Sequence, residues 1–152
     1  MKNIKIKRLV AASLFAALVC VATFVSIPIP GGNGYIHFGD AVIYVAASVL
    51  PSAYAIPCAA MGAGFADFAL GAAIWAPFTV VIKALMALCF RGKNKKISVM
   101  WAGIINCSGY YLAEWVLFSN PVTPVASLPF NILQSLASGV IFLVIFSIIK
   151  KK

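Results

Sequence analysis

The chain has 152 residues, 63% of them hydrophobic, and a mean hydropathy of +1.03. Because an ordinary globular domain holds only about 45–50% apolar residues, this composition excludes a soluble domain and indicates an integral membrane protein. The net charge of +9 comes mainly from Lys and Arg in residues 2–8, 91–96 and 150–152, which is typical of cytoplasmic segments beside membrane spans rather than of nucleic-acid binding.

The first predicted helix covers residues 8–27, close to the roughly 20 residues that cross a bilayer core. Pro28 and Pro30 end it, and a loop continues to residue 40. This loop holds the chain's one histidine and one of its three acids. Three glycines are expected to let the loop close over a bound ligand: Gly31, Gly32 and Gly34.

An apolar run over residues 41–70 is either one long helix or two helices divided at Pro51. A single helix would put the basic segment 91–96 on the opposite side of the membrane from residues 2–8, against the positive-inside pattern. Two helices put all the basic segments on one side. We therefore predict helices over residues 39–50 and 53–70.

Three more helices are predicted over residues 76–90, 97–118 and 127–149. Pro77 suits the first turn of the first of these, and a turn-rich outer loop precedes the last. The sequence thus predicts an all-α membrane protein, a bundle of six transmembrane helices with both termini in the cytoplasm. Residues 1–152 are expected to form a single domain.

Polar residues gather in the outer halves of these helices, in stripes with three- or four-residue spacing that share a helix face. An ionised group at bilayer depth costs at least about 2.5–3.5 kcal/mol, so such residues should point into the bundle. We expect a polar pocket that opens outward and is sealed below. The candidate substrate-binding residues are Tyr35, His37, Asp40, Asp67, Trp75, Thr79, Lys83, Asn106, Tyr110, Glu114, Asn131 and Gln134.

Several of these residues also admit purely structural roles. Lys83 pairs either with Asp67 or Glu114 in a buried ion pair, or with the ligand. His37 either contacts the ligand or caps a helix and bonds the backbone, and Asp40 is a candidate N-cap of the second helix as well as the favoured polar ligand contact.

The inner half of the first helix carries small residues at four-residue spacing, which let another helix approach closely. They serve either packing inside the bundle or docking of a partner helix. The candidate docking residues are Ala12, Ser13, Ala16 and Ala17.

The sequence has no nucleotide-binding P-loop, no zinc-protease motif and no serine, histidine and acid set that suggests a nucleophile. We therefore expect neither an enzyme nor a metal or cofactor. A short chain with an outward pocket and no source of energy suggests a binding subunit that depends on partners.

Five segments together point to a known family: residues 27–30 (IPIP), 34–41 (GYIHFGDA), 66–67 (AD), 74–79 (IWAPFT) and 82–86 (IKALM). They resemble the substrate-binding S component of energy-coupling factor (ECF) vitamin transporters, in particular the riboflavin-type and vitamin-precursor family. The resemblance extends over nearly the whole chain, and the run around GYIHFGD is its most specific part.

The resemblance implies a multi-pass protein of the prokaryotic plasma membrane that holds its substrate near the outer face. It also implies docking through the first helix onto a transmembrane coupling subunit driven by two cytoplasmic ATPase subunits. The expected substrate is a small vitamin or precursor with a heteroaromatic ring, pyridoxine-like or hydroxymethylpyrimidine-like, with riboflavin or a queuosine precursor as alternatives. A membrane assembly protein and a stand-alone carrier are the rival functions.

Overall fold

A computed structural model describes residues 2–29 and 35–150, which form six α-helices, one 3-10 turn and a short β-hairpin. The bundle is all-helical apart from the hairpin, as the sequence predicts. The elements in chain order are α1 (Lys2–Phe24), β1 (Ser26–Pro28), β2 (Tyr35–His37), α2 (Gly39–Val49), α3 (Ser52–Ala69), α4 (Ala76–Leu88), η1 (Cys89–Arg91), α5 (Lys95–Phe118) and α6 (Thr123–Lys150).

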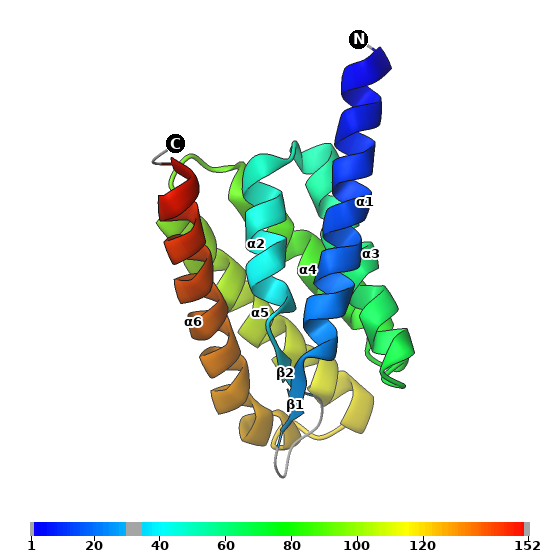
Figure 1. The fold of residues 1–152 in the computed structure, drawn as a ribbon. Coiled ribbons are helices and arrows are strands. Elements are labelled where there is room, and N and C mark those ends of the chain that lie inside the picture. The colour runs from blue at the N-terminus through cyan, green and yellow to red at the C-terminus, as the bar shows by residue number, and fades with distance from the viewer. Residues whose placement is uncertain (1, 30–34, 151–152) are drawn as a thin grey trace.

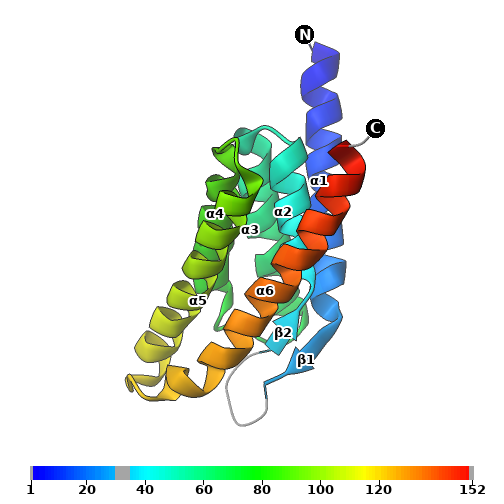
Figure 2. The same cartoon turned by 90° about the vertical axis from the view of Figure 1, so that its left-hand side faces the viewer.

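The helices run roughly along a common axis, and the two ends of the bundle differ in character. Figure 1 places the start of α1, the end of α6 and the connection between η1 and α5 at one end. These segments hold all the basic residues that the structure describes except Lys83. Figure 2 shows the β-hairpin at the opposite end, beside the first half of α6.

The first helix ends earlier than the sequence predicted, because the segment between α1 and α2 contains two short strands. Helix α1 ends at Phe24 rather than at residue 27, because Ser26–Pro28 pairs antiparallel with Tyr35–His37. The predicted loop is therefore partly a hairpin, in which Ser26 lies opposite His37. Backbone pairing across the two strands fixes where the side chains of β2 lie.

The division of the apolar run at Pro51 is confirmed. Leu50 has an extended backbone with ψ 148°, the conformation that a following proline favours. Pro51 has no N–H to continue a helix, and α3 starts at the next residue. Two short helices therefore turn back on each other here.

Local side chains also explain where α5 and α6 begin. The side chain of Asn94 accepts hydrogen bonds from the backbone N–H groups of Lys96 and Ile97, which caps α5. Helix α6 begins at Thr123, four residues before the predicted start, since Pro124 fits a first helical turn. The sequence-based prediction treated this proline as part of a loop.

Among the described residues, two helices are long and apolar enough to cross a bilayer by themselves, Asn3–Phe24 within α1 and Thr123–Lys150. Helices α2 and α4 have 11 and 13 residues, so at about 1.5 Å per residue each is shorter than a bilayer core of roughly 30 Å. The six helices are confirmed, whereas the expectation that all six span the membrane goes further than their lengths show.

Aromatic side chains close the bundle between the hairpin and the basic end. The ring of Tyr44 on α2 stacks on Phe90 of η1 at 5.0 Å between centroids, and Phe142 of α6 meets Phe90 edge-on at 5.3 Å. All three are at most 2% exposed. This aromatic layer corresponds to the seal below the polar pocket that was expected from the sequence.

Candidate functional site

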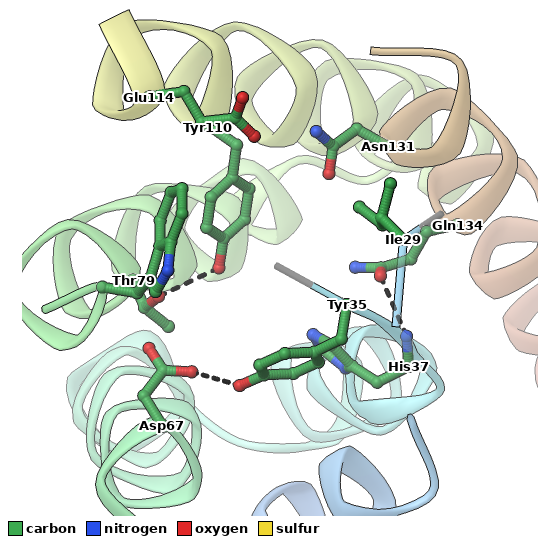
Figure 3. Close-up of a pocket in the computed structure, with 10 residues that line it drawn as sticks. Ile29, Tyr35, His37, Asp67, Thr79, Tyr110, Glu114, Asn131 and Gln134 are labelled. Carbon is green, nitrogen blue, oxygen red and sulfur yellow. Dashed lines mark hydrogen bonds between the residues drawn. The ribbon is translucent and has the colours of Figure 1, made fainter. Parts of the chain in front are cut away.

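A cavity lies at the hairpin end of the bundle and encloses about 410 Å³ of empty space, including its opening. Its walls come from the hairpin, α3, α4, α5 and α6, so residues far apart in sequence meet there (Figure 3). Nine of the twelve candidate substrate-binding residues line it. The lining consists of Ile29, Tyr35, His37, Asp67, Trp75, Thr79, Tyr110, Glu114, Asn131 and Gln134.

Gln134 of α6 fastens the hairpin to the bundle. Its Oε1 accepts a hydrogen bond from the backbone N–H of His37 at 3.0 Å, and its Nε2 donates to Asp40 Oδ2 at 2.7 Å. Gln134 is 5% exposed, so both bonds lie out of water. One amide thereby sets the position of β2 over the cavity and of the first turn of α2 behind it.

His37 caps α2, which was one of its two predicted roles. Its Nδ1 accepts a hydrogen bond from the backbone N–H of Gly39 at 3.1 Å. Thr23 of α1 stands on the other side, with its hydroxyl 3.5 Å from the same nitrogen. A side chain at Gly39 would collide with this Thr23 hydroxyl, so glycine is required where α1, β2 and α2 meet.

Lys83 pairs with Asp40, not with Asp67 or Glu114 as the sequence suggested. The distance from Lys83 Nζ to Asp40 Oδ1 is 2.7 Å, and both side chains are 0% exposed. The carboxylate of Asp40 thus faces α4 and α6 within the bundle, and the residue N-terminal to α2 is Phe38, whose side chain makes no capping bond. Asp40 is therefore not the N-cap, and it does not line the cavity.

The buried network continues from Lys83 toward α6. Lys83 Nζ donates to Asn106 Oδ1 at 2.8 Å, and Asn106 Nδ2 donates to Ser135 Oγ at 3.2 Å. Asn106 is fully buried. Three candidate site residues, Asp40, Lys83 and Asn106, thus form a polar layer that does not itself line the cavity.

The aromatic part of the wall joins α4 and α5. The ring centroids of Trp75 and Tyr110 are 6.3 Å apart, and those of Trp75 and Phe118 are also 6.3 Å apart. Thr79 Oγ1 and Tyr110 Oη are hydrogen-bonded at 3.0 Å, which holds the tyrosine ring against the cavity. The ammonium group of Lys83 lies 5.0 Å from the centroid of the same ring.

Tyr35 crosses the cavity from the hairpin and donates its hydroxyl hydrogen bond to Asp67 Oδ1 of α3. Burial and the nearby Asp67 both raise the pKa of the Tyr35 hydroxyl above its usual range. The hydroxyl therefore stays protonated and remains the donor. This bond connects the loop side of the cavity to the helix side.

Stability should depend on pH through His37. Burial first, and then the charge of Lys83, lower the pKa of His37 to about 4, although Asp40 acts in the opposite direction. The unfolded chain, with a pKa near 6.5, then binds more protons than the folded one, so stability is full above that value and is lost as pH falls toward 4. The loss between pH 7 and pH 5 is about 2 kcal/mol.

The variant H37N tests this expectation, because the asparagine Oδ1 can still accept from the Gly39 N–H. Thermal melting in detergent at pH 7 and pH 5 should show a smaller drop in the variant than in the wild type. Equal drops in both proteins would show that His37 does not titrate in this way.

The four candidate docking residues divide into two groups. Ala12 is 7% exposed and packs with Ala46 of α2 and Cys58 of α3. Ala16 faces Gly62 of α3, where a side chain would come within 2.6 Å of the Ala16 carbonyl oxygen. Ala12 therefore serves internal packing rather than docking. Ser13 and Ala17 are exposed, and with Ala16 they line a groove between α1 and α3.

The gate glycines Gly31, Gly32 and Gly34 lie outside the described residues. Two residues at the site were not predicted. Ile29 lines the cavity but carries no polar group that would single it out, and Thr23 contacts His37 from the first helix, where no substrate-binding residue was expected.

The family model described as "ECF-type riboflavin transporter, S component" matches residues 3–151. The chain belongs to this family. S components are the membrane-embedded, substrate-binding subunits of ECF transporters and are not enzymes, and they work with an ECF module of transmembrane and ATPase subunits.

Two other proteins are similar to this chain over most of its length. The solved structure of the S component of a bacterial ECF transporter has the same fold, with a TM-score of 0.80 over 99% of this chain and 98% of that one at 18% identity. A protein of Pyrococcus woesei, described as "uncharacterized protein in gap 3'region", is 29% identical over 133 residues, which cover 82% of this S component and 88% of that protein.

Proposed function

We propose that this S component captures a small, water-soluble vitamin or vitamin precursor with a heteroaromatic ring at the outer face of the prokaryotic plasma membrane. The observation that carries the proposal is the cavity itself. Rings from Trp75, Tyr110 and Tyr35 and polar groups from four helices converge on it. Binding sites for small molecules typically combine such apolar walls with a few convergent polar groups.

The orientation follows from the charges. Basic residues collect on the cytoplasmic side of membrane proteins, and the basic segments of this chain share the end opposite the hairpin. The cavity then faces outward, with both termini in the cytoplasm. Ligand enters beside the hairpin, and the aromatic layer around Phe90 blocks passage below it.

The size of the cavity favours a compact ligand. The empty space of about 410 Å³ includes the open mouth of the cavity, so the enclosed part is smaller still. A pyridoxine-like or hydroxymethylpyrimidine-like compound therefore suits it best, and riboflavin, which the family description names, or a queuosine precursor is the second candidate.

Docking onto the transmembrane coupling subunit is assigned to the groove between α1 and α3. Its floor holds Gly62 and its rim holds Ser13, Ala16 and Ala17, so a partner helix can approach the backbone closely. Ala12 is not part of this surface.

The variant A17L should separate binding from transport. The larger side chain fills the groove, so uptake by cells that carry the ECF module should fall by about tenfold or more. The dissociation constant of the purified protein should stay unchanged, because Ala17 lies away from the cavity. The exposed Ala126 of α6 offers a matched control, A126L, which should transport normally.

The function itself is tested by calorimetric titration of the purified S component with pyridoxine, 4-amino-5-hydroxymethyl-2-methylpyrimidine and riboflavin, followed by uptake in proteoliposomes with and without the ECF module. We expect one-to-one binding of one compound and uptake only with the module and ATP. Uptake by the S component alone would support a stand-alone carrier instead.

A further inference from the structure

The buried charges around the cavity do not balance. All three acidic residues of the chain are buried at this end of the bundle, with Asp40 at 0%, Asp67 at 4% and Glu114 at 2% exposure. Lys83 neutralises Asp40, and this is the one ion pair found among residues 2–29 and 35–150. Two carboxyl groups are left without a cation.

One oxygen of each carboxyl group also lacks a hydrogen-bond donor. Asp67 Oδ2 and Glu114 Oε2 are both buried, and neither has a hydrogen-bond partner in the part of the chain that the structure describes. Both residues line the cavity. Figure 3 shows them on separate parts of the wall, with the ring of Tyr110 between them.

Buried polar groups in native proteins nearly always have partners, and a buried carboxylate without one is strongly disfavoured. Here both residues line the space that a ligand would fill. A ligand that brings N–H donors, and preferably positive charge, would therefore complete the site rather than merely occupy it.

We infer that the ligand of this S component carries an amino or amidine-like edge of N–H donors that binds Asp67 and Glu114, as in an aminopyrimidine. The inference rests on the proposed binding function and narrows its substrate class. The heteroaromatic ring lies between the aromatic side chains, and the exocyclic amine, together with a ring nitrogen when it is protonated, faces the carboxylates.

The same geometry disfavours two alternatives. The polar edge of a flavin presents two carbonyl oxygens around a single N–H, and these acceptors would face the carboxylates. Pyridoxine offers hydroxyl donors and one ring nitrogen but no exocyclic amine. The preference of the site among these compounds therefore depends on whether the polar edge of the ligand donates or accepts hydrogen bonds. The three compounds differ in this property, so their affinities test it.

The test compares the wild type with E114Q and D67N, which keep the shape of each side chain and remove its charge. Binding of 4-amino-5-hydroxymethyl-2-methylpyrimidine, pyridoxine and riboflavin is measured by calorimetry on purified, folded protein. The variant N120D is the matched control, because it changes charge by one unit on an exposed residue outside the cavity.

We expect the aminopyrimidine to bind tightest to the wild type, E114Q and D67N each to weaken it by about tenfold or more, and N120D to leave it unchanged. Both neutral variants should also melt at a higher temperature than the wild type without ligand, since each removes the charge of a buried carboxyl group that has no cation beside it.

Tighter binding of riboflavin or pyridoxine, or unchanged aminopyrimidine affinity in both neutral variants, would overturn this inference and leave the proposed binding function intact. Failure of all three compounds to bind the folded wild type would overturn both.

Discussion

Replacing Lys83 with Met should destabilise the folded S component by about 3–5 kcal/mol, because the change leaves a buried charge without its partner. Asp40 lies 2.7 Å from Lys83 Nζ, and neither side chain is exposed. Gln134 would remain as a donor to Asp40, but an amide cannot replace a cation. Thermal melting of the purified protein in detergent measures the loss.

A double variant makes the result specific to the pair. D40N/K83M removes both charges and should recover much of the stability that K83M loses, as the energetics of buried ion pairs predict. The exposed Lys7 provides the control K7M, which should melt like the wild type. A K83M protein that melts normally but no longer binds ligand would contradict the structural role and assign Lys83 to ligand contact.

Removing the indole of Trp75 should weaken ligand binding by about 5- to 150-fold, since stacking of a heteroaromatic ring on an aromatic side chain contributes about 1–3 kcal/mol. Trp75 lines the cavity and lies 6.3 Å from both Tyr110 and Phe118. The measurement is the dissociation constant of W75A by calorimetry, with tryptophan fluorescence as a second signal.

The control for this change is W101A. Trp101 is 51% exposed and does not line the cavity, so its loss should leave the affinity unchanged. If W101A weakens binding and W75A does not, the ligand site lies elsewhere in the bundle.

The helices were predictable because hydrophobic length and basic clusters constrain a membrane protein strongly. Pro51 and the charge pattern together gave two helices where the apolar run alone allowed one. The hairpin escaped prediction because strands of three residues leave no periodic pattern. Ser26–Pro28 therefore looked like the end of a helix.

Most of the cavity lining was predictable from polar residues in apolar helices, but their partners were not. Asp40, Asp67 and Glu114 were all expected at similar depths in the membrane, so depth alone could not show which of them pairs with Lys83. The packing of α2 against α4 and α6 brings Asp40 to Lys83, and that packing depends on how each helix is rotated about its axis. Ala12 was misassigned for the same reason, since small residues serve packing inside a bundle as well as docking outside it.

The most direct measurement of the central claim is native mass spectrometry of the S component purified from its own membranes, followed by identification of any bound small molecule. We predict one heteroaromatic, amine-bearing vitamin precursor per protein in the wild type, and its loss in W75A. A folded wild-type protein that carries no small molecule and binds none of the three tested compounds would contradict the claim that this cavity is a ligand site.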